Sequence, residues 1–474
     1  MRNSRRVAAV VIPLVLAVAL AACSGGGSGG SGTARKGGTV TVAELPDSTP
    51  NLIFPLPPAS NTDGWDVNLT TPMWPVLTYA GDGAKSVDNF LQKEGSQMST
   101  FATNPMWKVV DGPWTLSSFQ SNGAYSYVPN RHYSGPDKPV LSKLDYAPFT
   151  TDTAELNALR SGNTLTTGYL PLNDAGQEGV LKSEGYSVAV QAVPGVAMIE
   201  PNLFNATAGP LLRQLYIRQA LEDLINRPQI VSKIYSGYAD PGNGPVPVLA
   251  FPSLASPLEK SGGPYPYSPA AAAAVLKAHG WKVVPGGTST CQRPGTGASD
   301  CGPGITAGEP LSLQLAYSSG QTSMDEQEAA IQSSEAQAGV KINLKSEPFN
   351  TLVGTVGTCT AGSHPASTCG WQLVDFGYDP YELYPAGSGF FNTGGPNNQG
   401  GYSDPTMDNL INATEYGSSS SAFFAYEDYA ARQLPWLWLP NQSFLQVYKS
   451  NLKGFTPLNP FSGSLNPEVW YFGS

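Results

Sequence analysis

Four cysteines in the second half of the chain are the residues most clearly placed for covalent chemistry. Cys291 and Cys301 flank one segment rich in turn-forming residues, and Cys359 and Cys369 flank another. An even set at such spacing is typical of disulfides in an oxidising compartment. Local pairing is the simplest of three possible connectivities, and each loop would contribute roughly 3 kcal/mol in the chain-entropy model. A zinc site using His364 is the alternative, but these spacings do not match zinc patterns.

Other residue types give little sign of catalysis. The three histidines, His132, His279 and His364, stand in turn or helix-end contexts with no nucleophile signature nearby. The sequence after residue 36 contains no Gly-x-Ser-x-Gly, His-Glu-x-x-His or Walker loop. Paired carboxylates for glycoside hydrolysis need no such motif, and nothing singles out a pair. We therefore predict no catalytic residue, metal or cofactor, and a secreted hydrolase acting on peptides or glycans stays open as an alternative.

The N-terminus has the pattern of an export signal. Arg2, Arg5 and Arg6 precede an apolar run over residues 7–22, which is short for a membrane span. Cys23 follows Leu-Ala-Ala, which resembles a bacterial lipobox, and this resemblance implies that Cys23 is lipidated. Residues 1–22 are then a lipoprotein signal peptide and 23–36 a flexible Gly/Ser tether. The alternative is an ordinary cleaved signal peptide with an incidental cysteine.

The composition favours an exported, loop-rich protein. Only 13% of the residues are charged, while the chain has 52 Gly and 42 Pro. Its net charge of −10 argues against nucleic acid and an anionic membrane surface as partners. The 474 residues are too many for one compact core and predict two or three lobes. No second long apolar run follows the first, so we expect no membrane span after the signal.

Periodicity and turn residues predict both strands and helices. Ile217, Ala220, Leu221 and Leu224 form one apolar helix face, and Arg218, on the polar side of that helix, is expected to be structural. Leu311, Leu313 and Leu315 alternate on a strand, which with a helix over 324–338 and a strand over 340–344 predicts a parallel βαβ unit. The other predicted elements are strands over 39–43, 107–119, 124–129 and 444–449, and helices over 153–161, 228–237 and 269–278.

Short motifs in a fixed order carry a resemblance to a known family. They lie at residues 37–40, 128–135, 154–162, 202–205, 217–221, 226–227, 264–270, 280–281 and 402–408. In this order, behind a lipobox, they resemble the solute-binding proteins of bacterial ABC importers, family 5, the oligopeptide/dipeptide-binding lipoproteins. The resemblance implies an α/β, two-lobed periplasmic-binding-protein-like fold of type II, cluster C, with a cleft between the lobes. Lobe I would span 37–200, lobe II 201–445, and 446–474 would return to lobe I.

The resemblance also implies partners and a location. We expect a monomer that binds a peptide or related small solute in the cleft and delivers it to the permease subunits of an ABC importer. Its lipid would anchor it to the outer face of the cytoplasmic membrane.

An acidic and aromatic segment holds the expected ligand site. In relatives an aspartate here pairs with the α-ammonium of the peptide, and Asp379 is the better match and Asp375 the alternative. A solvated acidic loop with Asp-Pro turn chemistry is the other interpretation. Further candidate contacts are aromatic or amide side chains, although core packing would also explain the aromatic ones: Tyr378, Tyr381, Trp371, Asn392 and Tyr402.

One stretch departs from the family pattern. Residues 75–84 run almost directly into 85–91, without the Trp-Ser-Asp-Gly motif that typical members carry. A small subdomain of lobe I, between about residues 80 and 100, is therefore expected to be shortened. This leaves a third interpretation, a non-functional deletion variant.

Overall fold

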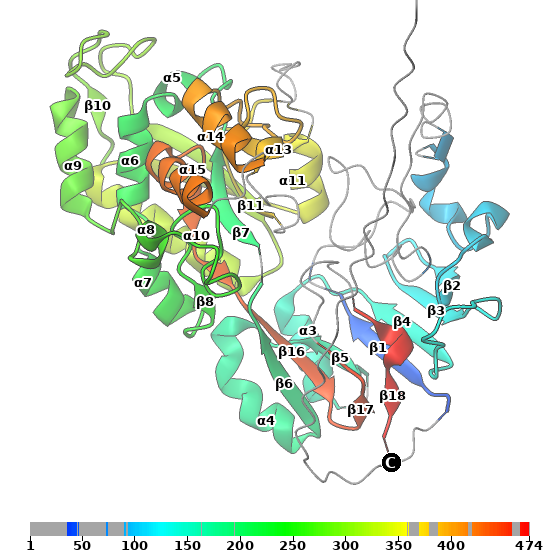
Figure 1. Cartoon of the computed structure of the whole chain (residues 1–474). Coiled ribbons are helices and arrows are strands. Elements are labelled where there is room, and N and C mark those ends of the chain that lie inside the picture. Colours follow the sequence, from blue (N-terminus) through cyan, green and yellow to red (C-terminus); the bar gives the residue numbers. More distant parts are fainter. Residues whose placement is uncertain are drawn as a thin grey trace, which may run out of the picture.

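Two β-sheets organise the chain, one in each of two lobes (Figure 1). The computed structural model describes residues 36–44, 46, 73, 90–91, 93–162, 164–193, 195–357, 359, 369–378, 387–415, 420–456 and 465–473. The predicted signal peptide, Cys23, Asp379 and Tyr381 lie outside these residues, as does most of the segment that is expected to be shortened. Within the described part, no helix combines the length and apolar character needed to cross a bilayer.

The first lobe is built on a seven-stranded sheet. In spatial order its strands are β2 (Trp114–Phe119), β3 (Tyr125–Pro129), β4 (Lys143–Ala147), β1 (Thr39–Ala43), β5 (Thr167–Tyr169), β16 (Phe444–Lys449) and β6 (Tyr186–Gln191). Helices α3 (Asp152–Arg160) and α4 (Glu178–Ser183) and the 3-10 helix η3 (Leu172–Gln177) accompany it. This lobe also contains the short 3-10 helices η1 (Met98–Thr100), η2 (Pro105–Lys108) and η6 (Pro467–Val469) and the strands β17 (Leu452–Lys453) and β18 (Tyr471–Phe472).

The second lobe is built on a five-stranded sheet. Its order is β12 (Lys341–Glu347), β11 (Ser312–Ser318), β13 (Leu373–Tyr378), β7 (Val196–Pro201) and β14 (Leu437–Leu439). The longer helices are α6 (Leu215–Asp223), α9 (Pro269–Ala278), α10 (Thr322–Glu335), α11 (Phe349–Val356), α14 (Pro405–Glu415) and α15 (Ser420–Gln433). Shorter elements are α5 (Gly209–Leu212), α7 (Arg227–Gln229), η4 (Ile230–Ile234), α8 (Pro257–Lys260), η5 (Ala336–Ala338), α13 (Ser388–Phe391), β8 (Ala239–Asp240), β9 (Trp281–Lys282), β10 (Thr290–Cys291) and β15 (Asn441–Gln442).

Local signals in the sequence correspond to the elements observed. Helix α9 begins at Pro269, and the side chain of Ser268 accepts a hydrogen bond from Ala271 N at 3.2 Å, as an N-cap does. Strands β11 and β12 are parallel, and α10 and η5 connect them up to Gly339, whose φ of 71° ends the helix. The predicted βαβ unit is therefore confirmed.

The strand expected from residue 107 begins only at Trp114. Pro105 starts a 3-10 turn instead, and the side chain of Asn104 caps this turn by accepting from Met106 N at 3.0 Å. The hairpin that follows is as expected: Gly123 has a φ of 93° between β2 and β3.

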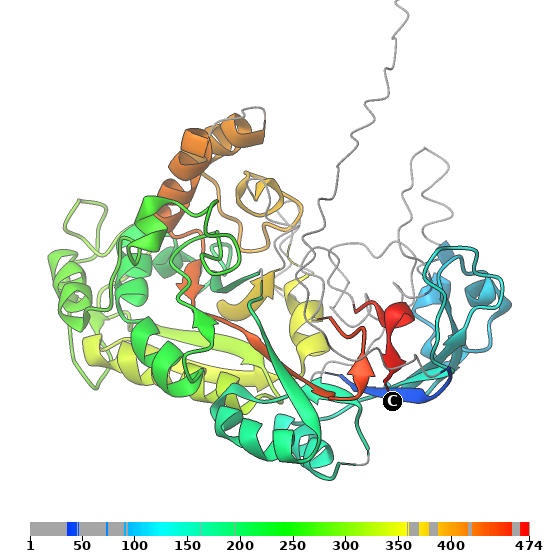
Figure 2. The ribbon, with the colours of Figure 1, turned by 60° about the horizontal axis from the view of Figure 1, so that its bottom comes forward.

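The chain crosses between the lobes twice. The first crossing joins β6 to β7, and the second joins β14 to β16; Figure 2 shows β6 and β16 running side by side toward the second lobe. Asn441 Nδ2 ties the crossings together by donating to Val193 O at 2.9 Å and Gly195 O at 2.6 Å. The two-lobed α/β fold is confirmed, but the sheets change at 192–195 and 440–443. The boundaries expected at 200 and 445 differ because β7 pairs with β13 and β14, and β16 with β5 and β6.

Candidate functional site between the lobes

The carboxyl ends of several strands in the second lobe lie at one edge of their sheet. Strand β11 is parallel to β12 and β13, while β13 and β14 are both antiparallel to β7. Tyr378, the last residue of β13, pairs with Val196, the first residue of β7 after the crossing. This edge therefore faces the junction of the lobes. In open α/β sheets ligands bind outside the carboxyl ends of the strands, which makes the junction the candidate site.

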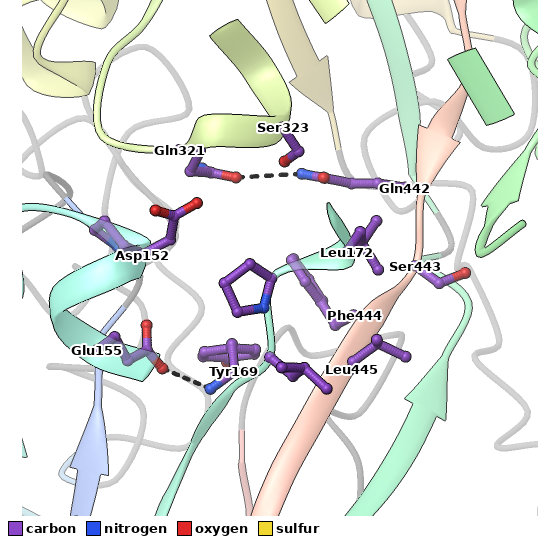
Figure 3. A pocket seen from close by; sticks show the side chains of 13 residues that line it. Asp152, Glu155, Tyr169, Leu172, Gln321, Ser323, Gln442, Ser443, Phe444 and Leu445 are labelled. Carbon is purple, nitrogen blue, oxygen red and sulfur yellow. Dashed lines mark hydrogen bonds between the residues drawn. The ribbon is translucent and has the colours of Figure 1, made fainter. Parts of the chain in front are cut away.

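A small pocket at this junction is lined by both lobes (Figure 3). Its polar lining comes from Asp152 and Glu155 on α3 and from Gln321, Ser323 and Gln442. Gln442 Nε2 donates to Gln321 Oε1 at 3.4 Å. The volume of about 40 Å³ has room for a few water molecules only. The pocket therefore marks where the lobes touch, and it is too small for a peptide.

Glu155 contributes a buried carboxyl group to this pocket. It is 1% exposed, and Tyr169 N donates to its Oε1. Burial raises the pKa of Glu155 to about 8, and the neighbouring Asp152 acts in the same direction, although the Tyr169 hydrogen bond opposes them. Glu155 therefore keeps its proton at neutral pH.

Asp375, predicted as the alternative ligand contact, is buried in the second lobe. It is 6% exposed, and Gln327 Nε2 donates to its Oδ2 at 3.0 Å. Burial raises the pKa of Asp375, and the Glu328 carboxyl group beside it raises this pKa further. The strand period explains the placement. Val374 and Phe376, the neighbours of Asp375 along β13, pack in the apolar cluster that contains Trp371, so Asp375 points to the opposite face of the sheet.

Trp371 lies beside the second disulfide. The structure pairs Cys291 with Cys301 and Cys359 with Cys369, which is the local connectivity. Trp371 is 5% exposed, and its Nε1 lies 3.2 Å from Cys359 Sγ. It also lines a second pocket of about 480 Å³, a ligand-sized volume, with residues of β11, β12 and α11. All of these lining residues belong to the second lobe.

The remaining predicted contacts have other hydrogen-bond or strand partners in the second lobe. Tyr402 is 8% exposed, and its hydroxyl group donates to Asp404 Oδ2 at 3.2 Å next to α14. Asn392 lies at the end of α13, where its carbonyl oxygen accepts from Asn398 Nδ2 at 2.9 Å. Tyr378 ends β13 at the junction edge. Sequence reasoning missed Asp152 and Glu155, because positions just before and inside the helix predicted over 153–161 give no sign of a second lobe nearby.

Comparison with known proteins decides the family. Residues 57–393 match the profile of the bacterial extracellular solute-binding proteins, family 5 Middle. The chain belongs to this family. The family 5 chain is 26% identical over 331 residues to Protein XP55 of Streptomyces lividans, a match that covers 68% of this chain and 52% of XP55. It is 28% identical over 203 residues to the glutathione-binding protein GsiB of Escherichia coli K12, covering 42% of this chain and 35% of GsiB.

Solved structures share the fold of this family 5 protein. The oligopeptide-binding protein AppA of Bacillus subtilis, in complex with a nonapeptide, matches with a TM-score of 0.69 at 15% identity, over 93% of this chain and all of that chain. Lactococcal OppA in its closed conformation gives 0.62 at 19% identity, over 83% of this chain and 70% of that chain. The chain spans about half of the length of XP55 and about a third of that of GsiB, and it shares the two-lobed fold of the solved structures. The family is one of binding proteins and not of enzymes.

Proposed function

We propose that this protein is the extracytoplasmic receptor of an ABC importer, which binds a peptide or related small solute between its lobes and delivers it to the permease. The observation that supports this most is the strand edge of the second lobe, which faces the first lobe across two adjacent crossings. Two lobes joined in this way can close on a ligand by small backbone changes at the crossings. Membership of a solute-binding family favours this function over the secreted hydrolase.

The ligand class follows from the relatives. GsiB is named for glutathione, and the AppA structure holds a nonapeptide. We therefore propose peptides or peptide-like solutes, with Asp379, directly after β13 in the sequence, as the partner of the ligand ammonium group. Tyr381 and Tyr378 would supply aromatic contacts, and Trp371, Asn392, Tyr402 and Asp375 are proposed as further candidate contacts.

The location is part of the same proposal. Residues 1–22 would direct export, and the lipid on Cys23 would hold the receptor at the outer face of the cytoplasmic membrane. There a monomer tethered by residues 23–36 stays within reach of its permease.

The subdomain of lobe I between about residues 80 and 100 is proposed to be shortened.

Ligand binding without turnover is the test of this function. Incubation with a pool of short peptides should raise the melting temperature and shift tryptophan emission to the blue, since a ligand at 100 times its Kd stabilises by about 2.7 kcal/mol. Mass spectrometry should recover the bound species unchanged. Cleaved products would favour the hydrolase. A low, broad melting transition that no peptide moves would favour a non-functional deletion variant.

The substitution Asp379→Ala should weaken the binding of peptides with a free N-terminus by about tenfold to a hundredfold, because a charge-assisted hydrogen bond contributes roughly 1.5–3 kcal/mol. Calorimetric titration with a free peptide and its N-acetylated form measures the difference. Glu382→Ala, in the same segment, is the control and should leave that difference unchanged. An equal loss for both forms of the peptide in Asp379→Ala would refute the ammonium contact.

A further inference from the structure

The N-terminus of α10 is capped from the other lobe. Its own N-cap residue, Gln321, makes no side-chain capping hydrogen bond. The carboxylate of Asp152, in the first lobe, takes this role: Thr322 N donates to Oδ2 at 2.8 Å, and Thr322 Oγ1 donates to Oδ1 at 3.0 Å. Asp152 N also donates to Gly320 O at 3.1 Å, so the contact runs in both directions. A carboxylate at a helix N-terminus also interacts favourably with the helix dipole.

Helix α3 does not need Asp152 for its own start. Thr151 is the N-cap of α3, and its Oγ1 accepts from Ala154 N at 3.2 Å. Asp152 is therefore free to face the other lobe, and it is 8% exposed there (Figure 3). Thr151 and Asp152 are adjacent, yet one caps within its lobe and the other caps across the junction.

The contact between Asp152 and α10 lies beside the two crossings, which would act as the hinge in a movement of the lobes. Gln321, next to Thr322, accepts from Gln442 on the second crossing. Ser236 Oγ, also in the second lobe, donates to Leu172 O of the first lobe at 2.7 Å. Asp152 supplies the carboxylate of this set. Separating the lobes would remove the cap from the first turn of α10, while Thr153 Oγ1 would still donate to Asp152 Oδ1, as it does here at 3.3 Å.

We infer that Asp152 is a positioning residue for ligand binding, which holds the lobes in the arrangement of this structure by capping α10 without touching the ligand. This inference rests on the proposed function. The apparent affinity of a receptor falls with the fraction of molecules in the binding-competent arrangement. Asp152→Ala should therefore lower the affinity about tenfold, the effect of one charge-assisted cap on that equilibrium.

The test compares Asp152→Ala with two matched variants. Thr151→Ala removes the cap of α3 but keeps the contact between lobes, and Asp152→Asn keeps a capping oxygen. Amide hydrogen exchange over residues 318–326 should become about tenfold faster in Asp152→Ala only. Small-angle scattering should give this variant the larger radius of gyration, and its affinity for the peptide pool should fall. Asp152→Asn should have an exchange rate, a radius of gyration and an affinity close to those of the wild-type protein.

The outcomes separate the two proposals. If the wild-type chain binds no peptide, the proposed function fails, while exchange and scattering still decide whether Asp152 holds the lobes together. If exchange and scattering of Asp152→Ala match those of Thr151→Ala, Asp152 does not hold the lobes and the inference is overturned. It is equally overturned if the lobes separate and the affinity stays the same.

Discussion

Replacing Arg227 with methionine is expected to destabilise the second lobe by about 3–5 kcal/mol, because it leaves a buried carboxylate without its partner. Arg227 and Glu222 form an ion pair in which the side chains are 7% and 3% exposed. Burial raises the pKa of Glu222 to about 7, and the positive charge of Arg227 limits that rise. Without Arg227, folding would have to bury a lone carboxylate or bind a proton at neutral pH.

The pair also satisfies the open edge of the sheet. Strand β14 is an edge strand that pairs only with β7 among the described strands. On its other side Trp438 N donates to Glu222 Oε2 at 3.1 Å, and Arg227 Nη2 donates to Trp438 O at 2.8 Å. The two side chains thus take the place of a neighbouring strand, and the lost bond to Trp438 O adds to the cost.

Urea unfolding of the whole chain measures this loss. Lys182→Met is the matched control, because Lys182 pairs with Glu178 at 2.6 Å on the surface, with side chains 58% and 37% exposed. Such exposed pairs contribute about 0–1 kcal/mol. The double variant Glu222→Gln with Arg227→Met should recover part of the loss, since it buries no charge. A loss in Arg227→Met no larger than in the control would show that the pair is unimportant.

Raising the pH from 5.5 to 8.5 is expected to reduce the stability of the protein. Burial raises the pKa of Glu155 and Glu427 to about 8 and that of Glu200 to about 7, from an ordinary value of 4.5. Each group keeps its proton in the folded chain after the unfolded chain has released it. The contribution of each group to the free energy of unfolding is therefore fully present below its pKa in the unfolded chain. It is lost as the pH rises toward and through its pKa in the folded chain, at up to about 1.4 kcal/mol per pH unit for each group.

Unfolding free energies at pH 5.5, 7.0 and 8.5 test this expectation. Glu155→Gln and Glu427→Gln should each flatten the pH dependence, because glutamine accepts the same hydrogen bonds without titrating. Glu326→Gln, on the exposed side of α10, should leave the dependence as it is. The window avoids Asp404, whose lowered pKa affects stability only in acid. Stability that is constant or rises across this window would contradict the buried-carboxyl argument.

The residues at which the chain passes from one lobe to the other could not be predicted exactly from the sequence. The presence of α6, α9, α10, β11 and β16 could be predicted because caps, turns and apolar periods act within one element. The crossings could be placed only to within several residues. Strands β7 and β16 have no local mark of the sheet they join, and that choice depends on partners hundreds of residues away.

The direction of side chains shows the same limit. Arg218 was expected to be structural, and this is confirmed: it is 5% exposed and donates to the carbonyl oxygens of Leu212, Gln433 and Leu434. Its place on the polar side of the helix did not predict these partners. Asp375 lies in a segment expected to contact the ligand, but the pairing of β13 turns it toward Gln327 and Glu328. The sequence around an arginine or aspartate does not show which polar groups will contact its side chain in the folded protein.

The sequence by itself determined the family, the two-lobed α/β class and most local elements, because ordered motifs, apolar periods and turn residues are local properties of the chain. Only the tertiary structure decided that Asp152 caps a helix of the other lobe, that Glu222 and Arg227 cover a strand edge, and that Asp375 lies in the core. The physical reason is that hydrogen-bond partners and burial are set by long-range packing, which brings together residues that no spacing in the sequence relates.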